Sequence, residues 1–302
     1  MKKKNIILII SVAMLFVISC ENSSKKEKQE DAINVDKNST SYLLEQVKTN
    51  NNNNEKIKIY SQILKMIGDN PDYRTICEYG DAMISLIKVY IEQDANITIE
   101  KLLDIIKIKE GYGRKIIKTD INNDGIDECF VMAGESNIAL MTNHGKLSYL
   151  DFSTTLEITK LLKTYTNDKT KNKYLLFRYD GGLGSGCDFC DLIAVKNGRL
   201  QKIFTSPKSH FNGCEVKDIN NDKKEEFICY EEILYKYLYW PRIYNWNGEN
   251  LYETTYNYPD FLINYYKNMN TETKDRADTF LKNKSKETSS FYGKYLKPMG
   301  NK

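Results

Sequence analysis

Five consecutive residues, Asp-Ile-Asn-Asn-Asp, occur twice in this chain, at 120–124 and, ninety-eight residues later, at 218–222. Each run precedes a short apolar segment, at 129–132 in the first copy and at 227–230 in the second. Identical runs with matching flanks indicate a duplicated structural unit. Asn, Asp and Gly also favour turns. We therefore predict two equivalent loops, each leading into an equivalent strand.

The periodicity of the apolar residues changes near Gly111. Before it, apolar residues recur at helical spacing, as in the segment 59–67, whereas after it they recur with the period of two that is typical of strands. Three tight turns ending at Gly145, Gly198 and Gly248 lie between apolar segments, 53 and 50 residues apart. Turns of this type between apolar runs are typical of β-hairpins. We expect three diverged hairpin units.

These patterns predict an α+β fold with a helical region at 42–111, a β repeat region at 112–257 and a C-terminal helical end at 258–302. We expect the N-terminal helices to stack as a small bundle. A closed propeller needs about four to eight four-stranded blades, and three units fall short of that. The antiparallel hairpin repeats are therefore expected to form a twisted sheet or a partial propeller packed against the helices. The Lys- and Ser-rich segment after Lys282 is expected to fray.

The N-terminus has the organisation of a signal peptide. Lysines at 2–4 precede a predominantly apolar run at 6–18, which spans roughly 20 Å as a helix, against about 30 Å for a bilayer core. This predicts a signal peptide at 1–19. Its ending, Val17-Ile18-Ser19-Cys20, resembles the lipobox of bacterial lipoproteins, whose cysteine is acylated and becomes the mature N-terminus. The resemblance implies that Cys20 carries a palmitate-type anchor; ordinary secretion, with Cys20 free or disulfide-bonded, is the alternative.

The segment 20–41 is almost entirely polar and predicts a lipidated, flexible tether. A protein anchored in this way would be attached to a bacterial membrane and face the periplasm or the cell surface. The signal-peptide lysines account for the net charge of +3, so the mature chain has 41 basic and 41 acidic residues. Balanced charge creates no field that attracts nucleic acid. We predict a membrane partner, through the lipid, and no nucleic-acid partner.

The first Asp-rich loop presents oxygen atoms at alternate positions around Gly125. Calcium binds about six to eight oxygens, from carboxylates, amides and backbone carbonyls. The segment resembles the calcium loops of FG-GAP and VCBS-type repeats, the units of integrin-like propellers, over about nine residues in each copy. By that resemblance the ion holds the loop in shape, and its ligands are Asp120, Asn122, Asp124, Ile126 and Glu128. The alternative is a turn that binds no metal.

The second copy departs from this pattern at the glycine. Lys223 replaces it and Lys224 follows. A lysine ammonium can take the place of the ion's charge, and residue 223 would need a strained backbone. The resemblance thus implies a second, weaker calcium site, with ligands Asp218, Asn220, Asp222 and Glu226.

Six cysteines remain besides Cys20, and in an exported protein they are disulfide candidates: Cys77, Cys129, Cys187, Cys190, Cys214 and Cys229. The Cys187-x-x-Cys190 pair fits a structural disulfide, either within the pair or to Cys214 and to Cys129 or Cys229. Free buried thiols, a zinc site with Cys214 and Cys229, and redox catalysis stay open. A redox pair normally has its first thiol at a helix N-terminus, whereas the following segment, 191–195, resembles a strand.

No arrangement of nucleophile, base and acid typical of an enzyme is found in the sequence. We therefore predict a non-catalytic, calcium-stabilised module of the cell envelope that binds a protein or a glycan. One alternative is an envelope thiol-disulfide oxidoreductase using Cys187 and Cys190. Another is an anchored carbohydrate-active protein with paired carboxylates among Asp180, Asp188 and Asp191.

Overall fold

The protein is described from a computed structural model at residues 39–68, 75–107, 110–111, 114–152, 158–180, 187–207, 209–234 and 238–297. Contacts divide the chain into two units, Met1–Tyr42 and Leu43–Lys302. The first unit is described only at 39–42, so the predicted signal peptide, Cys20 and most of the tether lie outside the described residues. No helix in the described part of the chain is long and apolar enough to cross a membrane.

Four helices precede the strands in the described residues. They are α2 (Thr40–Thr49), α3 (Asn53–Ile67), α4 (Ile76–Gln93) and α5 (Ile99–Ile106). Polar residues cap two of them, because the first N–H groups of a helix have no partner within it. The Asn52 side chain accepts from the Asn54 N–H at 2.9 Å, and the Thr98 hydroxyl accepts from the Lys101 N–H at 3.2 Å.

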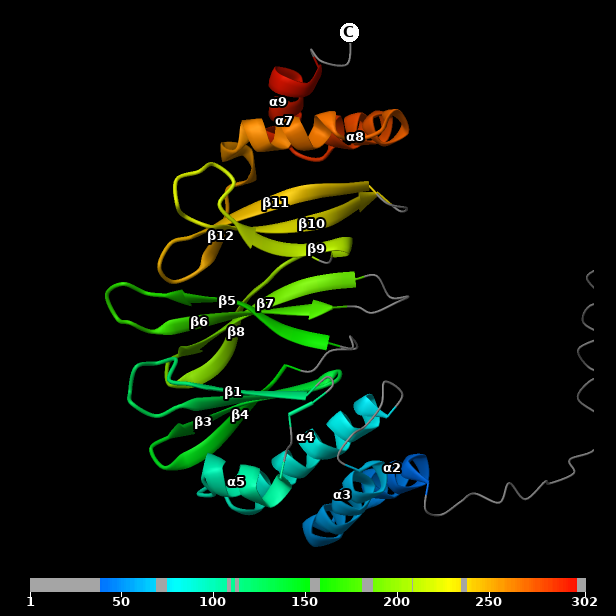
Figure 1. Ribbon diagram of the computed structural model, residues 1–302, viewed down its shortest axis with the longest axis vertical. Coiled ribbons are helices and arrows are strands. Elements are labelled where there is room, and N and C mark those ends of the chain that lie inside the picture. Colours follow the sequence, from blue (N-terminus) through cyan, green and yellow to red (C-terminus); the bar gives the residue numbers. More distant parts are fainter. Residues whose placement is uncertain are drawn as a thin grey trace, which may run out of the picture. The chain divides into compact units, whose positions relative to one another are not determined.

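The strands of the second unit form three antiparallel four-stranded units, sheets 1, 2 and 3 (Figure 1). Sheet 1 contains β1 (Arg114–Thr119), β2 (Glu128–Ala133), β3 (Ser136–Asn143) and β4 (Lys146–Asp151). Sheet 2 contains β5 (Ile158–Thr166), β6 (Lys173–Asp180), β7 (Cys187–Lys196) and β8 (Arg199–Thr205). Sheet 3 contains β9 (Ser209–Lys217), β10 (Glu226–Leu234), β11 (Leu238–Trp246) and β12 (Leu251–Glu253). Each sheet is a meander in which strands pair with their sequence neighbours.

The three predicted turns each join the third and fourth strands of a sheet. Gly145, Gly198 and Gly248 have φ angles of 73°, 68° and 100°, a region that glycine enters without steric cost. Sheets 2 and 3 are also joined by pairing of β7 with β9, so that hydrogen bonding continues through eight strands. The α+β fold class and the three-unit repeat are therefore confirmed.

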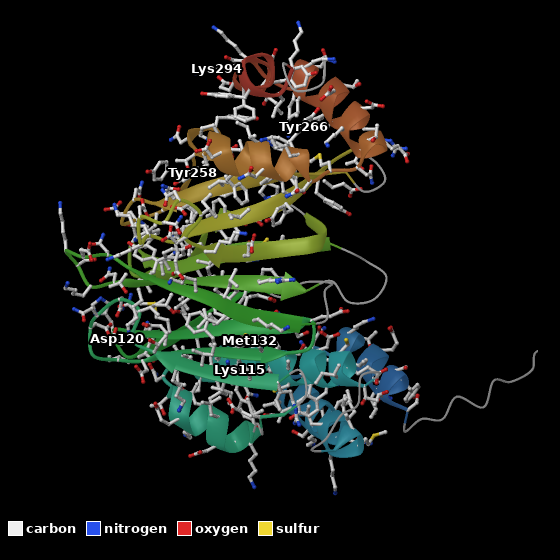
Figure 2. All side chains as sticks on the ribbon, turned by 45° about the horizontal axis from the view of Figure 1, so that its top comes forward. Lys115, Asp120, Met132, Tyr258, Tyr266 and Lys294 are labelled. Atoms are coloured by element: carbon white, nitrogen blue, oxygen red, sulfur yellow. The ribbon has the colours of Figure 1, made fainter. Side chains whose placement is uncertain are left out.

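The second strand of sheet 1 buries both of its faces. Cys129 and Val131 pack into a core shared with the N-terminal helices, whereas Phe130 and Met132 pack into a core shared with sheet 2. Successive side chains of a strand point to opposite faces, so a strand between two cores needs an unbroken apolar run. Figure 2 shows Met132 inside the protein among the ribbons.

The same division recurs in the other two sheets. In β6, Leu175 and Phe177 face sheet 1 while Leu176 faces sheet 3, and in β10, Phe227 faces sheet 2 while Ile228 faces the C-terminal helices. Apolar cores therefore lie between each pair of neighbouring sheets and on the outer faces of sheets 1 and 3, where helices cover them (Figure 1).

The N-terminal helices share their main core with sheet 1. Met83 of α4 and Leu102 of α5 pack with Val131 and Leu140. Gly80 permits this close approach, because a Cβ at that position would overlap the carbonyl oxygen of Ala133. The expected small bundle is present in α2, α3 and α4, whose residues Leu43, Ile63 and Ala82 form a core of their own, while the apolar faces of α4 and α5 also cover the sheet.

The chain ends in helices that cover sheet 3. They are η1 (Thr255–Asn257), α7 (Pro259–Lys267), α8 (Thr271–Asn283), α9 (Lys286–Phe291) and the π-helical turn η2 (Tyr292–Leu296). Leu262, Leu281 and Leu296 are fully buried against residues of sheet 3 such as Trp240. The expected fraying after Lys282 is therefore wrong as far as residue 297.

Candidate functional site

Loops from all three sheets gather at one edge, which Figure 1 shows on the left. They are the connections between the first and second strands, at 120–127, 167–172 and 218–225, and the three glycine turns. Neighbouring loops are hydrogen-bonded to each other. The Asn143 Nδ2 donates to the Gly198 carbonyl at 2.9 Å, and the Asn167 Nδ2 donates to the Gly248 carbonyl at 2.8 Å. We call this surface the loop edge; Figure 2 shows Asp120 on it.

The first Asp loop, residues 120–127, is closed by its own side chains. The Asp120 carboxylate accepts from the Asp124 N–H at 3.2 Å and from the Gly125 N–H at 2.8 Å. Asn122 accepts from the Asp124 N–H at 3.2 Å, and Asp124 accepts from the Ile126 N–H at 2.9 Å. The predicted ligand side chains at 120, 122 and 124 are thus brought together, as the alternate spacing requires.

Glu128 ties this loop to the sheet from below. It is the first residue of β2, only 1 % exposed, and its Oε2 accepts from the Ile121 N–H at 2.8 Å. Ile126, whose carbonyl is a predicted ligand, has an exposed side chain. The strand therefore holds Glu128 under the loop while the loop itself faces solvent.

The electrostatics of the first Asp loop favour a cation. The pKa of Glu128 is raised from 4.5 to about 7, mainly by burial and in addition by the nearby Asp124 and Asp120 carboxylates, against the opposing hydrogen bond from Ile121. Among the described residues, no lysine or arginine forms an ion pair with any of these three carboxylates. Hard oxygens with uncompensated negative charge are the donor set that calcium prefers.

In this structure the carboxylate oxygens of Asp120 and Asp124 accept hydrogen bonds from backbone N–H groups of the loop. Within the described residues, no group of three or more His, Cys, Asp or Glu side chains is arranged around a common point as metal ligands are. Calcium would therefore have to draw the carboxylates of Asp120 and Asp124 away from the N–H groups that they accept from here. The donor chemistry fits the ion, and the loop geometry is that of a self-bonded turn.

The second Asp loop, residues 218–225, repeats this network. Asp218 accepts from the Asp222 N–H at 3.2 Å and from the Lys223 N–H at 2.8 Å, and Asp222 accepts from the Lys224 N–H at 2.8 Å. Glu226, like Glu128, is 1 % exposed and accepts from the loop backbone, here from the Ile219 N–H at 3.1 Å. The duplication predicted from sequence thus extends to equivalent hydrogen bonds.

The two loops differ at the glycine position. Gly125 has a φ of 84°, and Lys223 adopts the same left-handed region with a φ of 68°. Only glycine enters that region without steric cost. The strained backbone expected at residue 223 is therefore present. Tyr258 also donates to Glu226 at 3.1 Å, whereas no side chain among the described residues donates to Glu128.

Three of the predicted cysteines meet in the core between sheets 2 and 3. Cys214 and Cys229 are cross-strand partners in β9 and β10, and both are buried together with Cys190. The pKa of the Cys214 thiol is raised, mainly by its hydrogen bond with Cys190 and also by burial, against the opposing hydrogen bond with Cys229. None of the three is disulfide-bonded here, and neither are Cys77 on α4 and Cys129 on β2. The structure therefore contains no disulfide among these five residues.

The Cys187-x-x-Cys190 pair lies within the strand β7. At about 3.3 Å per residue, the Cα atoms of two residues three apart on a strand are separated by roughly 10 Å, beyond the ~7 Å limit for a disulfide. A disulfide within this pair is therefore incompatible with the observed strand. The strand also speaks against redox catalysis, because a redox-active Cys-x-x-Cys pair normally has its first thiol at a helix N-terminus.

Asp191, a candidate for paired carboxylate chemistry, is fully engaged in the structure. It is 1 % exposed and accepts from the Tyr179 hydroxyl at 2.8 Å and the Thr205 hydroxyl at 2.6 Å, and it pairs with Lys202 at 2.8 Å. The side chains of Asp180 and Asp188 lie outside the described residues. The carboxylate that is described therefore stabilises sheet 2 through these three contacts.

Two cavities in the described part of the chain are large enough to consider as sites. The larger, about 560 Å³, lies between sheet 3 and the C-terminal helices, but its cations are already paired: Arg242 with Glu231 and Glu253, and Lys284 with Glu231. The smaller, about 210 Å³, lies at the loop edge beside the second Asp loop. Lys224, Glu225 and Glu226 of its lining belong to the second copy of the Asp motif; the other residues come from the separate strands β5 and β11, which the sequence did not predict to lie beside it.

Replacing Lys223 with glycine should stabilise the protein. Lys223 holds a φ of 68°, and relieving this strain is worth about 1 kcal/mol of unfolding free energy. Urea denaturation of Lys223→Gly should show a higher midpoint than wild type. The neighbouring Lys224→Gly, at a residue without positive φ, should show a lower one. A lower midpoint for Lys223→Gly would contradict the strain.

Glu128 should make the metal-free protein less stable as the pH rises. Its pKa of about 7 in the folded chain exceeds the ordinary 4.5, so between these values the folded chain binds more protons than the unfolded chain, and the free energy of unfolding falls with increasing pH. Glu128→Gln keeps an oxygen that can accept from Ile121 but cannot ionise. Denaturation across this pH interval in the presence of a chelator should show a smaller decline in the variant; equal declines would refute this role.

Comparison of the chain with protein-family models, with curated proteins and with solved structures finds no match. The likeness to FG-GAP-type loops therefore depends on the residues of the two Asp loops alone. What the structure adds is the equivalence of the two loops in backbone, hydrogen bonding and place in the sheet.

Proposed function

We propose that this protein is a membrane-anchored lipoprotein of the bacterial cell envelope, a non-catalytic module that binds a protein or a glycan and is stabilised by calcium. The lipobox-like ending at Cys20 supports the anchor. The observation that carries the calcium part is the crowding of Asp120, Asp124 and Glu128, with which no lysine or arginine of the described residues forms an ion pair. Bound calcium would supply the missing positive charge and would hold the first Asp loop in one conformation.

The residues of the loop have separate tasks in this proposal. Asp120, Asn122 and Asp124 offer short side chains whose oxygens already converge on the loop backbone. Glu128 approaches from the sheet, and the Ile126 carbonyl would complete the donor set. Gly125 allows the sharp turn between them, with a φ of 84°. The equivalent set in the second loop is Asp218, Asn220, Asp222 and Glu226, where Lys223 and Lys224 oppose cation binding.

A binding role fits the placement of the loops. Inner strands such as β2 and β10 bury both faces in apolar cores, so many of the polar groups that a partner could contact are displayed by the connections between strands. Hydrogen bonds between successive loops, such as that from Asn167 to Gly248, hold this surface together. A calcium ion at the first loop would stiffen one end of it.

Calcium binding is tested by calorimetric titration of the chelator-treated protein, residues 43–302. Wild type should bind one strong equivalent with a rise in melting temperature, because a ligand that binds only the folded state stabilises it. Asp120→Ala with Asp124→Ala should abolish this binding. The matched variant, Asp218→Ala with Asp222→Ala, should retain it. Wild-type protein that shows neither heat nor a shift in melting temperature would rule out the calcium part of the proposal.

The lipid anchor is tested in the full-length chain. Cells expressing the protein should incorporate an alkyne-tagged fatty acid into it, and the protein should fractionate with membranes. Cys20→Ala should abolish the label, because the residue that carries the acyl chains is gone. Without these chains, which together provide stable anchoring, the protein should move to the soluble fraction. A label that persists in the variant would place the acylation elsewhere.

A further inference from the structure

The two hairpins that carry the Asp loops differ at one pair of residues that face each other across their strands. Cys214 of β9 and Cys229 of β10 are directly opposite in sheet 3. Ile116 of β1 and Val131 of β2 are directly opposite at the equivalent positions of sheet 1, 98 residues earlier in the sequence. Cysteines therefore occupy both positions of one pair, and two cysteines can form a bond that the aliphatic pair cannot.

The backbone holds Cys214 and Cys229 at a separation that suits a disulfide. Residues directly opposite in an antiparallel pair have Cα atoms about 4.5 to 5.5 Å apart, within the range of about 4.4 to 6.8 Å found in disulfides. The two side chains share one face of sheet 3 and lie in the core between sheets 2 and 3. Their thiols are hydrogen-bonded to each other. A bond between these sulfur atoms therefore needs little movement of the backbone.

Cys190, the third cysteine in this core, is a poorer partner. Its thiol also contacts Cys214, but it lies on β7, whose pairing with β9 involves Cys187 and Asp188. Facing sheets pack about 10 Å apart, which exceeds the ~7 Å limit for the Cα atoms of a disulfide. Of the three cysteines in this core, the cross-strand pair in sheet 3 is therefore the favoured one.

A bond between Cys214 and Cys229 would close a ring around the second Asp loop. The chain between the two cysteines contains the end of β9, the whole loop at 218–225 and the start of β10. This loop has Lys223 in the left-handed region, with a φ of 68°, and Lys224 beside it. Both lysines oppose cation binding. A covalent bond at the base of the hairpin would constrain the second loop as calcium is proposed to constrain the first.

Both thiols are unreactive once the core has formed. Cys214 is 2 % exposed and Cys229 is 0 % exposed. The pKa of the Cys229 thiol is raised, mainly by its hydrogen bond with Cys214 and also by burial. Thiol–disulfide exchange needs an accessible thiolate. The bond therefore has to form while the chain folds, before sheet 2 covers this face of sheet 3.

We propose that Cys214 and Cys229 form a cross-strand disulfide in the exported protein. Both S–H bonds break and one S–S bond forms. The two electrons and two protons pass to a disulfide oxidant of the cell envelope, which is thereby reduced to two thiols. The structure described here is then the dithiol form. The inference rests on the export part of the proposed function, because disulfides form and persist mainly outside the cytosol.

Oxidative refolding of the full-length chain in detergent tests the pairing. The protein is unfolded with reductant, refolded in a glutathione redox buffer, and then unfolded in excess iodoacetamide. We expect two fewer alkylated cysteines than in the reduced protein. Trypsin cuts between the cysteines at Lys217, Lys223 and Lys224, so mass spectrometry should find one peptide containing Cys214 linked to another containing Cys229. Full alkylation, or a link from either cysteine to a different residue, would overturn the proposal.

The bond should also raise the stability of the fold. A disulfide that closes a loop of about 15 residues restricts the unfolded chain, so protein refolded with reductant should melt roughly 5 to 10 °C below the oxidised protein. Cys229→Ala should melt at one temperature under both conditions. Cys190→Ala removes the neighbouring thiol but leaves the pair, and should retain the difference. A difference that persists in Cys229→Ala and disappears in Cys190→Ala would contradict the pairing.

Peptide mapping of protein taken directly from cells separates this proposal from the function on which it rests. A Cys214–Cys229 bond in protein from the membrane fraction would support both. A protein that stays in the cytosol as a dithiol, but forms the bond in the redox buffer, would remove the export part of the proposed function and support the pairing. A membrane-attached protein without the bond would overturn the disulfide alone.

Discussion

The whole arrangement depends on strands that are apolar on both faces. In β2, every residue from Glu128 to Ala133 is buried, so this strand can exist only between two apolar layers. Sheets 1 and 3 would each expose an apolar face if the stack ended with them. A propeller removes its exposed faces by closing into a ring. Here three sheets are too few to close, and helices from both ends of the chain cover the outer faces instead, as capping elements do in repeat proteins.

Because helices and neighbouring sheets cover the sheet faces, the packing determines where polar groups are found. With both faces of each sheet packed, charged groups concentrate at the strand ends and in the connections. Glu128 and Glu226 lie at the boundary between the packed strands and the polar loops. Each is the first residue of the second strand of its sheet, is 1 % exposed and accepts a hydrogen bond from the backbone of the adjoining loop. A carboxylate in that position costs free energy unless a partner offsets its burial. In the second copy Tyr258 provides an additional hydrogen bond; in the first copy two aspartates add repulsion instead.

Much of the local structure was predictable from the sequence, because it depends on neighbouring residues. The glycine turns at 145, 198 and 248, the change of period near Gly111 and the duplicated Asp loops all have local causes. Partners distant in sequence were harder to predict. Apolar residues at 79–106 reveal a buried helix face but not that it covers sheet 1, and the polar composition after Lys282 conceals Phe291 and Leu296, which are buried. The cavity at Tyr165 and Trp246 depends on the packing of two sheets, which no local pattern encodes.

The two Asp loops share a hydrogen-bond network but not an electrostatic environment. Because the network of Asp218 and Asp222 forms with a lysine in the strained position, side-chain to backbone bonds are sufficient to shape such a loop, and its shape alone is no evidence for a metal. Charge is what distinguishes the copies. The carboxylates of the first form no ion pair with a described lysine or arginine, whereas the second contains Lys223 and Lys224, and Lys224 lines a cavity beside it. Divergence after duplication thus left a cation-attracting loop on sheet 1 and a loop with lysines of its own on sheet 3.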